Sequence, residues 1–346
     1  MIQRREFLGA TAAMCVLGTR NGWASTNRSD WSCETLQTVA CAPGLYAPVV
    51  TGVALQPGGN QLATVGDDHC VSIFELPSAR LVTSLARHRD WVRTARYSPD
   101  GKTLATAGND RQILLWDTST WSAPALLAAH KQAIADVSFA PHGRVLAAVG
   151  FDAMLRVYDV AKRQLINHYE LPCSDMHALC FADEGATVVS GGRSGVIRAV
   201  DWASGRLLWD VAAHAKRVRC LSVNSQGLIV SCGEDQKVRV FRQDDPEQVI
   251  LEKRLSSKQF AAIWIDHQTM ATAGADNQVS IWDIAHKQTT SLLQGHTGTV
   301  SCLDFQGGTL VSGSFDTQVR IWRRQTQVQL DLRQLDQAAG WSQQLR

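Results

Sequence analysis

One spacing, repeated seven times, constrains this chain of 346 residues more than any other feature. An Asp, replaced once by Ser, recurs at nearly equal intervals, at Asp68, Asp110, Asp152, Ser194, Asp235, Asp276 and Asp316. The residue six places later is aromatic in every copy except one, which has Val200. Three places later stands Val, Ile or Leu, and four places earlier stands Thr, Ser or Ala. Repetition with so regular a period predicts an architecture of stacked, similar units.

Each copy has the pattern of several short strands. Segments such as 113–116 and 238–241 follow the alternation of a strand, and turn-forming residues such as Ser98-Pro99-Asp100-Gly101 separate them. Short strands separated by such turn residues indicate antiparallel all-β structure. A four-stranded sheet of ~40 residues cannot bury both of its faces alone, so neighbouring sheets must stack. Seven such sheets around an axis predict a seven-bladed β-propeller of four-stranded antiparallel blades.

The repeats resemble the WD-repeat β-propeller family over about residues 47–322. The Trp-Asp pair that names the family stands here as Trp116-Asp117 and Trp282-Asp283. Blades 1, 4 and 6 lack the family's upstream histidine, which the other four blades have as His88, His130, His214 and His296. The resemblance implies a propeller domain over residues 47–325, with blade 4 as its most divergent repeat.

Two sets of side chains in this pattern have the residue types of a catalytic triad plus a tryptophan. They are His88, Thr106, Asp110 and Trp116 in one blade, and His296, Ser312, Asp316 and Trp322 in another. Such sets recur from blade to blade, whereas a catalytic triad does not, so a structural role is the stronger interpretation. The resemblance implies that the Asp holds the His and that the hydroxyl links it to the Trp ring. In blades without the His, backbone donors are expected to hold the Asp.

Closure of the ring requires one more outer strand. The segment 34–40, within an N-terminal segment of residues 25–46, alternates like a strand and is the favoured candidate. The segment 327–332 follows Trp322 at hairpin distance and is the alternative. Residues 326–346 are then either a polar, Gln-rich tail or the outer strand of blade 7.

The segment 1–24 predicts an export signal. It begins charged, continues apolar from residue 7 to 17 and ends in small residues, which favours cleavage after Ala24. The pair Arg4-Arg5 followed by Phe7-Leu8 resembles a twin-arginine signal, and the alternatives are a basic Sec signal or a chance Arg pair. The resemblance implies a bacterial periplasmic protein that is exported folded. No other stretch is apolar enough to span a membrane, so no membrane insertion is expected after cleavage.

The charge balance argues against nucleic acid as a partner. Removing the segment 1–24 takes away Arg4, Arg5, Arg20 and Glu6, so the totals of 34 basic and 32 acidic side chains both become 31. A neutral chain lacks the excess of Lys and Arg that non-specific binding to phosphates requires.

The sequence predicts few disulfide pairs among the cysteines that remain after cleavage. Cys33 and Cys41 flank the proposed closing strand and are too far apart to pair with each other. Cys173 with Cys180 is a possible disulfide. Cys220 and Cys302 occupy equivalent positions in the first strand of their blades and are expected to be free and buried.

The same region offers the soft ligands Met176, His177 and Cys180. If residues 176–180 form a strand, Met176 and Cys180 face one side and His177 the other, so they cannot converge on one metal. No spacing typical of a zinc or c-type haem site occurs. No metal and no cofactor are therefore predicted.

An aromatic residue outside the repeat pattern, Trp91, marks a candidate partner-binding surface. It lies in the loop between blades 1 and 2, on the face where the family usually binds its partners, and it either contacts a partner or caps the blade. The residues expected near it on the same rim are Arg93, Asn109, Phe151, Arg193, Arg217, Arg219, Glu234 and Phe315.

Several functions are compatible with these features. The leading hypothesis is a monomeric, non-catalytic scaffold that binds a protein or peptide on the ring face. One role for such a scaffold is as an accessory factor to an exported redox enzyme. The alternative is a cofactor-carrying enzyme, because residues 199–209 resemble the docking repeat of quinoprotein propellers; a plain hairpin turn at Gly205 explains that segment as well. A third hypothesis is that Arg193, Arg217 and Arg219 bind an anionic ligand.

Overall fold

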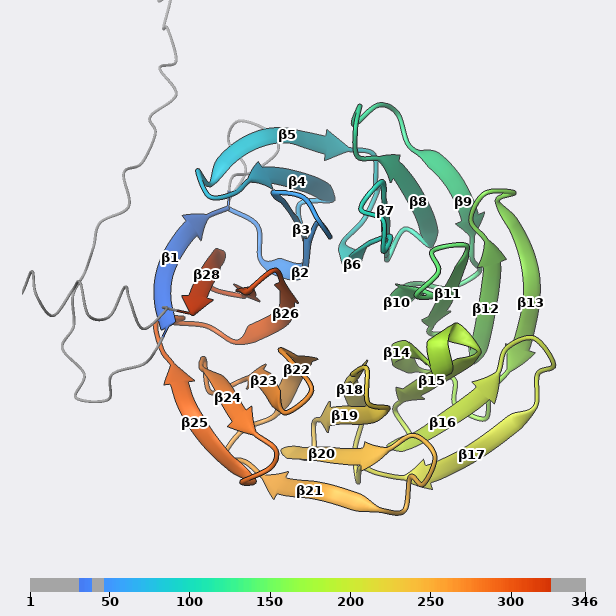
Figure 1. Ribbon diagram of the computed structural model, residues 1–346. Helices are drawn as coiled ribbons and strands as arrows, with labels where there is room; N and C mark the ends of the chain where they lie inside the picture. The colour runs from blue at the N-terminus through green and yellow to red at the C-terminus, as the bar shows by residue number, and fades with distance from the viewer. Residues whose placement is uncertain (1–30, 39–46, 325–346) are drawn as a thin grey trace, which may run out of the picture.

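The computed structural model describes residues 31–38 and 47–324. Within these residues, 28 strands form seven four-stranded antiparallel sheets arranged around a central axis (Figure 1). The prediction of an all-β, seven-bladed propeller is confirmed. The helical structure in the described part of the chain is one 3-10 turn, η1 (Asp183–Gly185).

The first four blades each contain four consecutive strands, with the innermost strand first. Blade 1 holds β2 (Val50–Leu55), β3 (Gln61–Gly66), β4 (Cys70–Glu75) and β5 (Arg80–Ala86). Blade 2 holds β6 (Val92–Tyr97), β7 (Thr103–Gly108), β8 (Gln112–Asp117) and β9 (Ala125–Ala129). Blade 3 holds β10 (Ile134–Phe139), β11 (Val145–Gly150), β12 (Met154–Asp159) and β13 (Gln164–Glu170). Blade 4 holds β14 (Met176–Ala182), β15 (Thr187–Gly192), β16 (Val196–Asp201) and β17 (Leu207–Ala212).

The remaining blades complete the ring, and the last one takes its outer strand from the start of the chain. Blade 5 holds β18 (Val218–Val223), β19 (Leu228–Gly233), β20 (Lys237–Arg242) and β21 (Val249–Arg254). Blade 6 holds β22 (Gln259–Trp264), β23 (Thr269–Gly274), β24 (Val279–Asp283) and β25 (Gln288–Leu293). Blade 7 holds β26 (Val300–Gln306), β27 (Thr309–Ser314), β28 (Gln318–Arg324) and β1 (Trp31–Gln37).

The strand β1 closes the ring. It runs antiparallel to β28 in an unbroken register from Trp31 opposite Arg324 to Gln37 opposite Gln318. Leu36 on this strand is 4% exposed and packs into the cluster between blades 7 and 1. The closing strand begins earlier in the chain than the expected range of 34–40. The alternative segment 327–332, the predicted export signal 1–24 and Cys41 lie outside the described residues.

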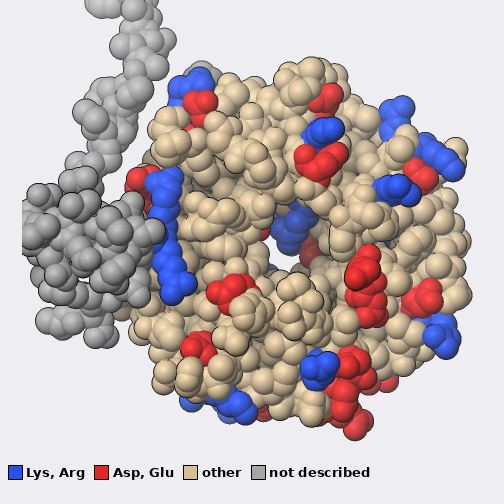
Figure 2. Space-filling view, viewed as in Figure 1, with Lys and Arg blue, Asp and Glu red and all other residues tan. Residues whose placement is uncertain are grey.

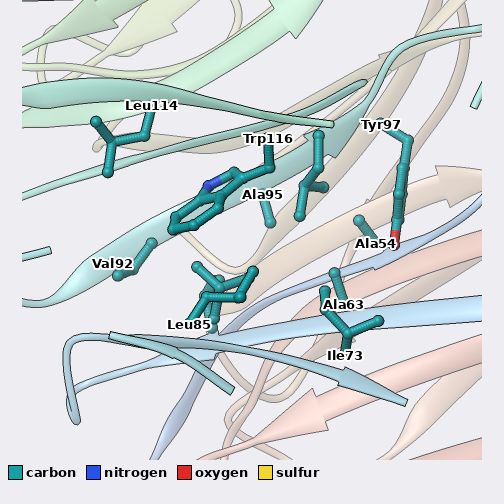
Figure 3. Close-up of a cluster of buried hydrophobic side chains, with 12 residues drawn as sticks. Ala54, Ala63, Ile73, Leu85, Val92, Ala95, Tyr97, Leu114 and Trp116 are labelled. Carbon is teal, nitrogen blue, oxygen red and sulfur yellow. The ribbon is translucent and has the colours of Figure 1, made fainter. Parts of the chain in front are cut away.

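The hydrophobic core lies between blades rather than inside them. Each of seven buried clusters joins two neighbouring sheets, one cluster for every interface of the ring. Figure 3 shows the cluster between blades 1 and 2, where Ile73 and Leu85 of blade 1 face Val92 and Trp116 of blade 2. A single blade would leave these side chains in water, so the blades depend on one another for stability.

Two sequence-based expectations about β14 were wrong. Met176 packs with Leu179 between blades 3 and 4, whereas Cys180 packs between blades 4 and 5. A β-bulge between Met176 and Ala178 inverts the alternation, so Met176 and Cys180 lie on opposite faces of the sheet. Cys173 also packs on the side of Met176, and Cys173 and Cys180 are both free.

The other cysteines are partly as expected. Cys220 and Cys302 are free, but they are half-buried rather than buried, because both line the central channel. Cys33 is free and exposed. Cys70 is disulfide-bonded.

Candidate functional site

The residues that resemble a triad form closed hydrogen-bond chains inside blades 2 and 7. In blade 2, His88 contacts Asp110 through Nδ1 at 2.8 Å and Thr106 Oγ1 through Nε2 at 2.8 Å. Trp116 Nε1 donates to the same hydroxyl at 2.9 Å. A neutral imidazole that carries its proton on Nδ1 satisfies every group of this chain, since it donates to the carboxylate and accepts from the hydroxyl. The side chain of His88 is 0% exposed, so this imidazole cannot meet a substrate.

Blade 7 repeats this arrangement with Ser in place of Thr. His296 contacts Asp316 at 2.9 Å and Ser312 at 2.8 Å, and Trp322 Nε1 donates to Ser312 Oγ at 2.9 Å. The side chain of His296 is 1% exposed. Both sets thus link a loop to two strands, and the sequence-based structural interpretation fits this geometry.

Three other blades contain variants of this hydrogen-bond chain in which one or two of its members are replaced. In blade 5, His214 contacts Asp235 and Ser231, both at 2.9 Å, without an indole. In blade 3, where Ala148 has no hydroxyl, His130 Nε2 contacts the hydroxyl of Tyr158 at 2.7 Å. In blade 6, Trp282 donates to Thr272 at 2.9 Å.

Blades without the histidine differ in how they hold the repeat Asp. In blade 1 the N–H of Cys70 donates to Asp68 at 3.2 Å, as expected for a backbone donor. In blade 6 the Oδ1 atom of Asp276 is buried and has no hydrogen-bond partner among the described residues. The expectation that backbone donors hold the repeat Asp therefore fits blade 1, but it does not fit this oxygen of Asp276 in blade 6.

As the pH is lowered below about 6.5, the free energy of unfolding is expected to decrease. Burial lowers the pKa of His214 and of His296, although the paired carboxylates oppose this, and burial together with the charge of Arg156 lowers the pKa of His130 to about 4. The unfolded chain, with histidines near their ordinary pKa, binds more protons at mildly acidic pH, so acid favours unfolding. For His130 alone the loss at pH 5 is about 2 kcal/mol relative to neutral pH.

Thermal melts at pH 7.5 and pH 5.0 test this prediction. The variant His130→Gln should lose less stability on acidification than the wild type, whereas His142→Gln, at an exposed turn, should behave like the wild type. A melting temperature that rises at pH 5.0 would contradict the prediction.

The second notable arrangement is a ring of side chains around the axis. Every innermost strand carries a β-bulge at the same place near its start. The extra residue of a bulge is left out of the ladder, so its side chain is redirected. All seven extra residues line one central cavity, and we call them the bulge ring: Thr51, Arg93, Ala135, His177, Arg219, Phe260 and Ser301.

The cavity has a volume of about 200 Å³, and Trp91 and Phe315 also line it. We call the bulge ring together with these two aromatics the channel mouth. Trp91 is 46% exposed and Phe315 is 53% exposed, and neither belongs to an interblade cluster. Figure 2 shows an opening at the centre of the disc with basic and acidic atoms on its wall.

The structure brings the predicted rim residues together in two groups. In the first, Arg93 Nε donates to Asn109 Oδ1 at 2.5 Å, and the guanidinium lies 5.1 Å from the ring centre of Phe151. Neutral partners thus hold this cation. Arg193, in contrast, is exposed and does not line the cavity.

The second group is an ion-pair network. Arg217 contacts Glu234 at 3.1 Å and Asp175 at 2.6 Å, and Arg219 contacts Glu234 at 3.5 Å. The guanidinium of Arg219 lies 4.9 Å from the ring centre of Phe260. The two carboxylates are therefore already engaged by basic side chains.

Sequence reasoning missed Asp175, His177 and Phe260. His177 joins the two groups, because its ring lies edge-on to Phe151 at 5.2 Å and its Nε2 is 2.8 Å from Asp175 Oδ1. A signal was present in the sequence, because the bulge-ring positions recur in step with the repeat Asp.

The segment that resembles a quinoprotein docking repeat serves as a turn and a packing contact. Gly205 has a φ of 76° in the turn between β16 and β17, a conformation that favours glycine. Trp209 lies edge-on to Phe241 of blade 5, with 6.1 Å between ring centres. Both features stabilise the hairpin and its interface.

Comparison with known families agrees with this geometry. Residues 49–292 match a family model described as the IFT122 first beta-propeller, and residues 287–323 match the WD domain, G-beta repeat. The chain belongs to the IFT122-type family of WD-repeat β-propellers. WD-repeat propellers generally mediate protein–protein interactions.

Three curated relatives match this WD-repeat propeller over segments of the chain. Autophagy-related protein 16 of Arabidopsis thaliana is 29% identical over 141 residues, which is 39% of this chain and 28% of the relative. Sterol regulatory element-binding protein cleavage-activating protein of Xenopus laevis is 29% identical over 131 residues, 38% of this chain and 10% of the relative. Mitochondrial division protein 1 of Schizosaccharomyces pombe is 44% identical over 54 residues, 16% of this chain and 8% of the relative. The chain thus spans less than a third of each of these relatives.

Two further findings concern the described part of this propeller. No group of three or more His, Cys, Asp and Glu side chains there could hold a metal ion. No helix in the same residues is both long enough and apolar enough to cross a bilayer.

Proposed function

We propose that this propeller is a non-catalytic, monomeric scaffold that binds a protein or peptide at the channel mouth. The observation that carries the proposal is the pair of half-exposed aromatics, Trp91 and Phe315, beside a cavity of about 200 Å³ on a rigid ring. Exposed aromatic and arginine side chains next to a pocket are the usual anchors of protein interfaces. The histidines that resemble catalytic bases are enclosed in the blades and support no competing site there.

Substitution of Trp91 tests this proposal. Trp91→Ala should weaken partner binding by about 2 kcal/mol, roughly thirtyfold, because a central aromatic anchor is lost. The free energy of unfolding should change by less than about 1 kcal/mol, since the indole is half-exposed. Affinity purification with the wild type as bait would supply the partner, and calorimetry would supply the affinities.

Leu126→Ala on the outer strand β9 is the matched control, because Leu126 is 51% exposed and lies away from the cavity. It should bind like the wild type. A large loss of stability in Trp91→Ala would show instead that the indole caps the blade.

The site of action is part of the same proposal. We propose export in the folded state to a bacterial periplasm, where the propeller would assist an exported redox enzyme. The support is the sequence Arg4-Arg5 followed by Phe7-Leu8. Replacing both arginines with lysine should retain the protein in the cytoplasm, as measured by cell fractionation. Normal export of that variant would favour the Sec route.

A further inference from the structure

The charges of the channel mouth are unbalanced. The bulge ring contains Arg93, Arg219 and His177 and no carboxylate. Burial and the positive charges of Arg219, Arg217 and Arg93 lower the pKa of His177 to about 4, although Asp175 opposes them. The ring therefore carries two positive charges at neutral pH, contributed by blades 2 and 5.

The nearby carboxylates neutralise this ring only in part, by way of the 3.5 Å contact between Glu234 and Arg219. Asp175 and Glu234 are shared with Arg217, which contacts both of them. Asp136, which also lines the cavity, accepts a hydrogen bond from Thr94 at 3.0 Å and lies 3.5 Å from Arg96. Among the described residues, no carboxylate forms an ion pair with Arg93. Its Nε donates to the amide of Asn109 and its guanidinium lies against the ring of Phe151, while the charges of Asp90 and Asp175 act on it without a direct ion pair. The two terminal nitrogens of Arg93 form no hydrogen bond with a described residue.

The surroundings strengthen an electrostatic contact at this position. Each guanidinium of the ring lies against an aromatic side chain, Arg93 against Phe151 and Arg219 against Phe260. Contact with a ring restricts the movement of each guanidinium, and a preorganised guanidinium matches the two oxygens of a carboxylate. Partial enclosure in the cavity also reduces screening by water and salt.

Beyond the arginines, the mouth is apolar on one side. Trp91 and Phe315 come from blades 2 and 7, and only the small residues Thr51 and Gly52 of blade 1 lie between them in the lining. A bound peptide could thus place a carboxylate in the cavity and neighbouring apolar side chains against these two aromatics. This arrangement fits an acidic residue inside a peptide, with chain on both sides of it.

We propose that the channel mouth recognises an internal Asp or Glu of an extended peptide. Its carboxylate enters the cavity between Arg93 and Arg219, and neighbouring apolar side chains of the peptide contact Trp91 and Phe315. This inference rests on the proposed function, because it names the chemistry of the peptide that the scaffold binds.

Selection from a random peptide library tests the proposal on the mature protein. The peptides are displayed with both ends blocked, and a second library carries a fixed phosphoserine. The wild type should enrich sequences with an internal Asp or Glu next to Trp, Phe, Leu or Met. The variants Arg93→Gln and Arg219→Gln should lose the acidic preference.

Affinity of one selected peptide then measures the contact. Arg93→Gln should bind at least about tenfold more weakly, as should a peptide in which Gln replaces the acidic residue. Combining both changes should cost little more than either alone, because they remove the same interaction. Arg163→Gln, on the turn between β12 and β13 at the opposite end of the blade, is the matched control and should bind normally. Thermal melts confirm that each variant is folded.

The failures are distinguishable. Selected peptides without acidic enrichment, or with affinities that Arg93→Gln and Arg219→Gln leave unchanged, would overturn the inference and leave peptide binding intact. A preference for phosphoserine through the same arginines would replace the carboxylate with a phosphate and overturn it too. If the wild type selects no peptides that the Trp91→Ala variant does not also select, the proposed function fails and this inference fails with it.

Discussion

A chain that begins at Thr38, and therefore lacks β1, is expected to lose about 5 kcal/mol of stability and to aggregate. The strand contributes the full ladder with β28 and the buried Leu36 side chain. Without it, β28 becomes an open edge and the cluster between blades 7 and 1 is exposed to water. Chemical denaturation, followed by tryptophan fluorescence, measures the loss.

A chain that begins at Asp30 is the matched control, because it keeps β1 and removes only the residues before it. It should unfold at the same denaturant concentration as the full-length protein. Equal stability of the two truncated chains would mean that another segment closes the ring.

The second large effect is expected from Asp110→Ala, which should destabilise the propeller by about 3 kcal/mol. The carboxylate accepts hydrogen bonds from His88 and from the N–H groups of Arg89 and Gln112. Hydrogen bonds from these groups lower the pKa of Asp110, although burial opposes them. Removal of the carboxylate leaves the Nδ1–H of a fully enclosed imidazole without an acceptor.

Asp276→Ala provides the comparison, since this residue has the same place in blade 6, which lacks the histidine. One of its oxygens has no partner in the described residues, so the loss should remain below about 1 kcal/mol. Both variants can be measured by urea denaturation at pH 7.5. Equal losses would show that the contribution of Asp110 does not come from its histidine.

The sequence predicts most of this architecture because the repeat marks both the strands of each sheet and the residues buried between sheets. Each Asp and the aromatic residue that follows it at a fixed distance mark a turn and a buried strand, and seven copies determine the number of blades. The networks of His88 and His296 were expected from the resemblance to WD-repeat blades, and their hydroxyl and Trp members lie at fixed distances from the repeat Asp.

The wrong prediction for the faces of β14 has a physical cause. It assumed strict alternation along an innermost strand, whereas each of those strands contains a bulge. The assumption put Met176 and Cys180 on one face of β14. Asp175 and Phe260 were missed because their roles depend on contacts between blades 4, 5 and 6, which the spacing within one repeat does not reveal.

The bulge ring has a consequence for how such a scaffold can diverge. Thr51 and Ser301 hydrogen-bond a backbone carbonyl of the neighbouring blade, so these two belong to the frame. The other five side chains stand outside the ladder and the interblade clusters, so exchanging one alters the wall of the cavity without removing a strand pair. If the channel mouth is the binding site proposed above, a library that varies only these five codons would sample new specificities on an unchanged frame.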